Sequence, residues 1–182
     1  MRHTFVVHVE DKPGVLNRVA SLFRRRAFNI ESLTVGHTET DGVSRMTIVV
    51  DTDANGGRRL EANLYKLVNV LRVTDLTGEA AVIRDLTLIR VAATHETRTQ
   101  VMQLVDTFRA RVVDVAPDSL IIEATGTEDK IDGLLGVLRP YGVLEMVRTG
   151  RVAMSRGQRS VATEPTGEST PIETDDNVSH SV

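Results

Sequence analysis

The order of strand-like and helix-like segments restricts the fold of this chain more than any other feature of its sequence. The first part contains four stretches with the alternating apolar residues of half-buried strands and two with the spacing of amphipathic helices. In chain order these segments are residues 4–9, 13–26, 29–37, 43–51, 58–68 and 70–77. The order βαββαβ predicts an α+β unit of the ferredoxin-like type, in which a four-stranded antiparallel sheet carries two helices on one face.

The same order of segments recurs in the second part of the chain. Strands are expected at 85–93, 112–115, 120–124 and 143–147, and helices at 97–109 and from 127 to the break at Tyr141-Gly142. The sequence therefore predicts two ferredoxin-like units, residues 1–78 and 79–157. Sheet edges and uncovered sheet faces in such small units favour pairing with another copy, so a dimer or a larger assembly is expected.

The last segment, residues 158–182, differs in composition from the rest of the chain. It is rich in Ser, Thr, Pro and acidic residues and contains few large apolar side chains. Its acidic residues are Glu164, Glu168, Glu173, Asp175 and Asp176, against the single basic Arg159. Such a composition cannot bury enough apolar surface to offset the entropy of ordering, so a disordered, solvated tail is expected.

The composition excludes several kinds of site. The chain has no cysteine, which removes disulfides, thiolate nucleophiles and thiolate metal sites. Its histidines lack the spacing of metal ligands, and its serines lack a His/acid constellation, so neither a metal site nor catalytic residues are expected. No apolar run approaches the ~20 residues of a membrane span, and no signal peptide is evident, so the expected location is the cytoplasm.

Nucleic acid is also an unfavourable partner. The net charge is -3, and aromatic residues make up only 3% of the chain. RNA-recognition motifs share the βαββαβ topology, but they need exposed aromatic residues on the central strands. Only Phe5 is available in the first strand, and the strand at 43–51 has none, so this alternative ranks last.

A turn between the first strand and the first helix is a candidate binding site for a small molecule. Glu10-Asp11-Lys12 is followed by Pro13-Gly14 and an amphipathic helix. Pro13 suits the first helical position, and Gly14 permits close approach to the backbone. The N–H groups of the first turn could hold a carboxylate while Asp11 holds an ammonium group, as a free amino acid requires.

An ordinary strand-to-helix turn, capped by Asp11, is the competing interpretation of the same residues. The spacing alone favours this structural interpretation by a modest margin. The second unit has Thr94-His95-Glu96-Thr97 at the corresponding position and lacks the Asp-x-Pro-Gly pattern. If only one unit binds a ligand, the first is therefore the better candidate.

Several stretches resemble known families. Residues 10–16, E-D-K-P-G-V-L, resemble the turn of the ACT domain, a module that senses small molecules. N-I-E-S-L-T-V at 29–35 and S-R-M-T-I at 44–48 resemble the regulatory small subunit of acetolactate synthase (acetohydroxyacid synthase), as do K-L-V-N-V-L-R-V at 66–73 and R-T-G at 148–150. The resemblance covers about residues 1–157 and excludes the acidic tail.

The resemblance implies a regulatory rather than a catalytic protein. Members of this family bind a catalytic large subunit, which carries thiamine diphosphate, Mg2+ and usually FAD. That subunit condenses pyruvate into acetolactate, or pyruvate with 2-oxobutyrate into acetohydroxybutyrate. The small subunit raises this activity and confers feedback inhibition by valine, sometimes by leucine or isoleucine, and no cofactor is expected in the chain itself.

The resemblance also implies where the effector binds, at an interface between the ACT domains of a homodimer. One wall would consist of Asp11, Gly14, Val15 and Leu16 of one chain, and the other of Asn29 and Ile30 of its partner. Backbone N–H groups at 14–16 would hold the effector carboxylate. The alternative is a stand-alone ACT sensor of amino acids that regulates another enzyme.

Overall fold

The computed structural model describes residues 1–157, and the predicted disorder of 158–182 concerns residues outside that range. The first unit contains, in chain order, β1 (Arg2–Glu10), α1 (Val15–Arg25), β2 (Ile30–His37), β3 (Val43–Asp51), α2 (Ala54–Leu64) and β4 (Val70–Asp75). The second contains β5 (Ala81–Ala92), α3 (Arg98–Thr107), β6 (Arg111–Val115), β7 (Ser119–Gly126), α4 (Glu128–Leu138), the 3-10 turn η1 (Arg139–Tyr141), β8 (Val143–Arg148) and β9 (Val152–Ser155). The predicted α+β class with two βαββαβ units is confirmed.

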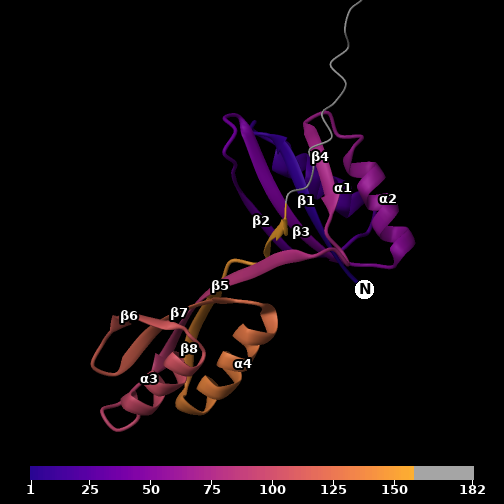
Figure 1. Cartoon of the computed structure of the whole chain (residues 1–182). Helices are drawn as coiled ribbons and strands as arrows, with labels where there is room; N and C mark the ends of the chain where they lie inside the picture. Colours follow the sequence, from indigo (N-terminus) through magenta and orange to yellow (C-terminus); the bar gives the residue numbers. More distant parts are fainter. Residues whose placement is uncertain (158–182) are drawn as a thin grey trace, which may run out of the picture.

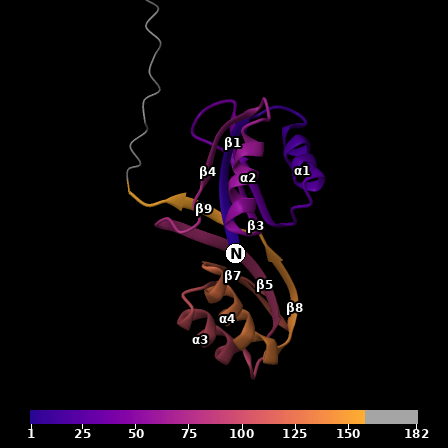
Figure 2. The same cartoon turned by 90° about the vertical axis from the view of Figure 1, so that its right-hand side faces the viewer.

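The two sheets have the same antiparallel topology. Their strand orders are β2-β3-β1-β4 and β6-β7-β5-β8. Each sheet has its two helices on one face (Figures 1 and 2). We call the opposite face of the first sheet its open face. Within residues 1–157, every helix falls short of the length and apolar character that a membrane-spanning helix needs.

Alternation along the strands places the core under the helices. In β1, Phe5, Val7 and Val9 are buried in one cluster with Phe23 of α1 and Leu60 of α2. This burial removes apolar side chains from water, which is the main stabilising contribution to folding. These five core residues all lie at positions where the apolar spacing of the sequence predicts burial.

The second unit repeats this arrangement. Ile89 and Val91 of β5 pack with Val101 of α3 and with Leu134 and Leu138 of α4. All five side chains are fully buried. The predicted helical stripes at 97–109 and after 127 thus form the inner surface of the second helical layer.

Helix α2 begins earlier than predicted. It starts at Ala54 instead of residue 58, because the Asp53 carboxylate caps it by accepting a hydrogen bond from the Gly56 N–H at 2.6 Å. Gly56 and Gly57 precede the predicted start of the helix, in a stretch expected to be a loop, but they lie inside the helix and are buried, so that expectation is wrong. The helix also ends at Leu64, four residues before the predicted end at 68. Val68, expected on the buried face of this helix, is instead 91% exposed.

The strand that joins the two units is longer than predicted, and it acquires a partner that was not predicted. Residues 81–84 of β5 pair with β9, from Ala81 opposite Ser155 to Arg84 opposite Val152. Ala153 of β9 packs with Val6 of β1, whose side chain faces away from the helices. The β5–β9 ribbon therefore lies against the open face of the first sheet (Figure 2). The domain boundary at 78/79 remains a prediction, because β5 contacts both units.

Candidate functional site

The turn before α1 has a different backbone from the one predicted. Gly14 is the N-cap residue of α1 with φ 83°, so Pro13 precedes the helix and does not occupy its first position. Only glycine adopts this left-handed conformation without strain. A Cβ atom at Gly14 would meet nothing within 4 Å, so conformation rather than close approach explains the glycine.

The first turn of α1 presents unused donors. The first helical hydrogen bond runs from the Arg18 N–H to the Gly14 carbonyl at 3.0 Å, and the Val15 N–H donates to the Lys12 carbonyl at 3.3 Å. The N–H groups of Leu16 and Asn17 precede that first helical bond and have no intrahelical acceptor. No side chain caps the helix, and its first turn contains no acidic residue. The interpretation of Asp11 as a helix cap is therefore wrong.

Residues that directly precede β3 and β4 hold the turn in place. The Asp11 N–H donates to the Gly42 carbonyl at 2.8 Å, and the Glu10 N–H donates to the Asn69 carbonyl at 2.9 Å. The Asn69 side chain donates to the Glu10 carboxylate at 2.6 Å and accepts from the Arg18 guanidinium. The hydrogen bond from Asn69, together with Lys12, lowers the pKa of the Glu10 carboxyl below its ordinary value.

The Asp11 side chain has a polar neighbour that the sequence did not indicate. Its Oδ2 lies 3.3 Å from Nδ1 of His37, the last residue of β2, and both side chains are exposed to solvent. The hairpin register creates this contact, because the turn at 38–42 returns the chain beside Asp11. The end of β2 and the Gly14 turn therefore lie at the same end of the first sheet.

The two predicted walls of the effector site lie apart within one chain. Asn29 is exposed and Ile30 is partly buried at the start of β2, where Ile30 pairs with Val50. Gly14 lies at the other end of α1, whose eleven residues span about 16 Å. One chain alone cannot enclose a small ligand between these walls.

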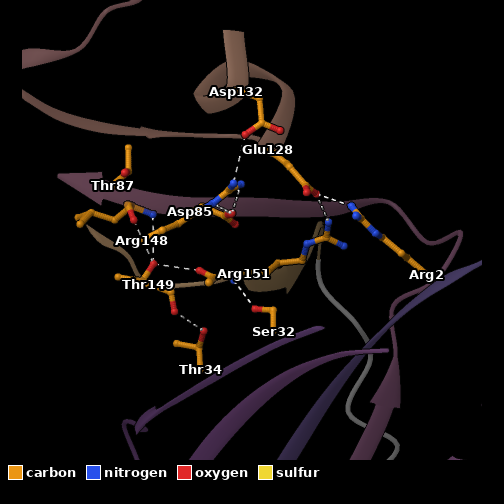
Figure 3. Close-up of polar contacts among 12 residues, drawn as sticks. Arg2, Ser32, Thr34, Asp85, Thr87, Glu128, Asp132, Arg148, Thr149 and Arg151 are labelled. Atoms are coloured by element: carbon orange, nitrogen blue, oxygen red, sulfur yellow. Dashed lines mark hydrogen bonds and ion pairs between the residues drawn. The ribbon is translucent and has the colours of Figure 1, made fainter. Parts of the chain in front are cut away.

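Arginines and carboxylates meet at a second polar site, the junction between the two units (Figure 3). Oε2 of Glu128 accepts from Nη1 of Arg2 at 2.6 Å and from Nη2 of Arg151 at 3.2 Å. Arg2 also pairs with Glu31 through Nε at 2.9 Å. The backbone N–H of Arg151 donates to Oγ of Ser32 at 2.9 Å, which ties the strand after the R-T-G stretch to β2.

A buried ion pair completes the junction. Nε and Nη2 of Arg148 contact Oδ2 of Asp85 at 2.7 and 2.5 Å, and Nη1 contacts Asp132 at 3.3 Å. Asp85 is only 5% exposed, and its Oδ1 has no hydrogen-bond partner among the described residues. The bonds to Arg148 compensate for burying the Asp85 carboxylate beside the second core.

The junction surrounds a cavity of about 450 Å³. Its lining consists of Arg2, Glu31, Ser32, Leu33, Val49, Asp85, Glu128, Arg148, Thr149, Gly150 and Arg151. Three arginines face three carboxylates, so the lining has no excess charge that would select an anion or a cation. We regard the junction as a structural connection that relates the positions of the two units. No local sequence pattern indicates this junction, because its residues come from distant segments.

Comparisons with known proteins agree with the arrangement of the two units. A model described as "AHAS small subunit-like ACT domain" matches residues 5–72, and a model described as "Small subunit of acetolactate synthase" matches residues 84–157. The probable acetolactate synthase small subunit of Archaeoglobus fulgidus is 54% identical over 159 residues, covering 87% of this chain and 99% of the relative. The small subunit of Bacillus subtilis is 45% identical over 163 residues, covering 89% and 95%.

A solved structure gives the same result in three dimensions. The crystal structure of the acetolactate synthase small subunit from Thermotoga maritima superposes with a TM-score of 0.81 at 40% identity. The match covers 87% of this chain and 99% of the other. Both units and their arrangement thus recur in that protein.

Proposed function

Because the chain belongs to the family of acetolactate synthase small subunits, we propose that it confers inhibition by valine on a catalytic large subunit. The chain is a non-catalytic regulatory subunit that serves branched-chain amino-acid biosynthesis. The large subunit supplies thiamine diphosphate, Mg2+ and usually FAD, and both subunits work in the cytoplasm. Leucine and isoleucine act as further effectors of the same site.

The observation that carries this proposal is the uncapped first turn of α1. The N–H groups of Leu16 and Asn17 have no intrahelical acceptor, and the positive end of the helix dipole lies behind them. A carboxylate placed there meets no competing acid from the first turn of α1. Asp11, in the loop that precedes α1, attracts the ammonium group of the same ligand.

A homodimer supplies the second wall. β2 is an edge strand of its sheet, so its outer hydrogen-bonding groups can pair with β2 of a second copy. Antiparallel pairing places the start of one β2 beside the end of the other. Since His37 at the end of β2 contacts Asp11, Asn29 and Ile30 of the second copy come next to the Gly14 turn.

The completed site recognises the effector with distinct groups. The Asn29 amide donates to and accepts from the polar groups of the ligand, and Ile30 contacts its aliphatic side chain. Leu16 is 44% exposed and extends the apolar surface, whereas the Val15 side chain is 4% exposed in the core and contributes only its backbone. One methylene in such a pocket changes affinity by about 1–3 kcal/mol, so cross-reactivity among branched amino acids follows.

Regulation requires the effector to prefer one arrangement of the assembly. Valine bound across the dimer interface stabilises the arrangement in which the large subunit has low activity. The shift cannot exceed the difference in affinity between the two arrangements. The junction around Glu128 provides a polar connection from the first unit to the second.

Titration calorimetry of the purified chain tests this function. Valine is expected to bind saturably, with one site for each predicted pair of walls in the homodimer. Asn29→Ala is expected to abolish the binding. Asn55→Ala, an exposed amide on α2, is the matched control and should bind normally. Valine binding that survives in Asn29→Ala would refute the site, and saturable binding of serine alone would favour a stand-alone amino-acid sensor.

Reconstitution with a large subunit tests the regulatory role. Gly14→Asp places a negative charge where the carboxylate binds and should remove valine inhibition while activation of the large subunit persists. Full valine sensitivity in both Gly14→Asp and Asn29→Ala would contradict the assignment.

A further inference from the structure

The open face of the first sheet carries three basic side chains side by side. His8 of β1 lies opposite Arg45 of β3 and opposite Arg72 of β4 in the strand register. Residues directly opposite in antiparallel strands have Cβ atoms about 4.5–5.5 Å apart on the same face. Like charges in such positions repel each other, so this row is unfavourable without a counter-ion.

A small pocket lies over this row. Its volume is about 110 Å³, and its lining residues are Val6, His8, Arg45, Arg72, Thr74, Leu76 and Ser155. The lining thus combines basic groups, two hydroxyls and two apolar side chains, without a carboxylate. Ser155 comes from β9, so the pocket forms only because the β5–β9 ribbon lies against this sheet.

The basic groups lack acidic partners within residues 1–157. The Arg72 side chain makes no hydrogen bond or ion pair there, and Nδ1 of His8 is buried without a partner. Arg45 donates one hydrogen bond, from Nη2 to the Ala153 carbonyl at 2.5 Å, which anchors it at the pocket. Glu39 in the 38–42 turn interacts with His8 and Arg45 only by longer-range electrostatic attraction and forms no ion pair with them.

We propose that His8, Arg45 and Arg72 bind a phosphate-type oxyanion on the open face of the first sheet. Phosphate groups carry a charge of about -1.5 to -2 near neutral pH, which two arginines can balance. Guanidinium groups match phosphate oxygens with two parallel hydrogen bonds, and the hydroxyls of Thr74 and Ser155 add neutral donors. Water occupies about 30 Å³ per molecule, so the pocket can exchange several waters for one phosphoryl group.

This site differs from the proposed effector site. The effector turn lies at the N-terminus of α1, on the helical side of the sheet, whereas His8, Arg45 and Arg72 lie on the opposite face. The oxyanion site is complete in one chain and needs no second copy. Its occupancy therefore does not depend on the valine proposal.

NMR titration of the full chain with inorganic phosphate at fixed ionic strength tests the site. The imidazole signals of His8 should shift saturably with one phosphate per chain. Arg72→Gln should weaken binding by about tenfold or more, because at least one charge-assisted hydrogen bond to the phosphate is lost. Arg59→Gln on α2 removes the same charge from an exposed helix position and should bind phosphate as the unmodified chain does.

Three results would overturn the proposal. The first is a response to phosphate no greater than that to chloride at equal ionic strength. The second is an equal loss of affinity in Arg72→Gln and Arg59→Gln, which would indicate general charge attraction. The third is acetate binding as tightly as phosphate, which would indicate a carboxylate site. Because the Arg72 side chain is exposed and makes no hydrogen bond or ion pair within residues 1–157, its variant should keep the native melting temperature, which the same samples can show.

Discussion

Nη1 of Arg2 donates a hydrogen bond to Oε2 of Glu128 at 2.6 Å, although the two residues are 126 positions apart. The bond connects the first strand of one unit to the first residue of α4 in the other (Figure 3). Arg151 shares the same carboxylate oxygen at 3.2 Å. The relative position of the two units therefore depends in part on one side chain.

Glu128→Gln should weaken this junction. The substitution removes the charge that both Arg2 and Arg151 contact, and the 34% exposure of the Glu128 side chain limits the effect. We expect a loss of about 1 kcal/mol in the free energy of unfolding, measured in urea. Glu145→Gln breaks the exposed 3.5 Å pair with Arg90 and should change stability by less than about 0.5 kcal/mol. Equal losses in the two variants would contradict a special role for Glu128.

Asp85→Asn should lower the free energy of unfolding more than substitution of the nearby Asp132 does. Its carboxylate is 8% exposed and takes two contacts from Arg148, which would keep only the weaker contact with Asp132. We expect about 2–3 kcal/mol of destabilisation, because a partly buried guanidinium loses its main partner. Asp132→Asn, at a side chain 57% exposed, should cost under about 0.5 kcal/mol. Chemical unfolding of both variants measures which loss of stability is larger. A larger loss in Asp132→Asn would contradict this prediction.

Two glycines inside helices should respond oppositely to a methyl group. A Cβ on Gly57 would lie 2.5 Å from the His3 ring, so Gly57→Ala should destabilise the chain by about 1–3 kcal/mol. Gly136 in α4 has nothing within 4 Å of that position, so Gly136→Ala should stabilise by about 0.5–1 kcal/mol. Thermal unfolding measures both changes. A neutral Gly57→Ala would show that α2 can move away from the sheet easily.

The pH dependence of stability should include a contribution from His8. Burial, followed by the charges of Arg45 and Arg72, lowers the pKa of His8 below its ordinary 6.5. The unfolded chain therefore binds a proton at higher pH than the folded chain does, and stability should fall as pH drops below about 6.5. His8→Gln should reduce this loss of stability at low pH. An unchanged pH profile of unfolding in that variant would contradict a contribution from His8. In Arg72→Gln, the pKa of His8 measured by NMR should rise towards 6.5.

Local patterns predicted most helices and strands correctly, and the errors have physical causes. The start of α2 was missed because Gly56 and Gly57 are typical of loops, whereas here they fit beneath Thr52 and His3. β9 was missed because four residues, 152–155, are too short to show a period. It becomes a strand only by pairing with β5.

The residues of the candidate effector turn were predicted from the sequence, but their structural partners were not. The sequence pattern and the resemblance identified Asp11, Gly14, Val15, Leu16, Asn29 and Ile30, and these assignments remain predictions. The sequence did not indicate the partners Asn69, which directly precedes β4, and His37, the last residue of β2. The left-handed Gly14 could have been suspected from Pro13-Gly14, since that pair is typical of turns.

The sequence by itself determined the two βαββαβ units, the inner faces of their strands and helices, and the family. These features depend on periodicity and on motifs within short segments, because the spacing of apolar residues along a segment indicates which of them are buried. Only the tertiary structure decided the Glu128 junction and the row of His8, Arg45 and Arg72. Strand register and the path of the β5–β9 ribbon create both, because they bring together side chains that no local pattern relates.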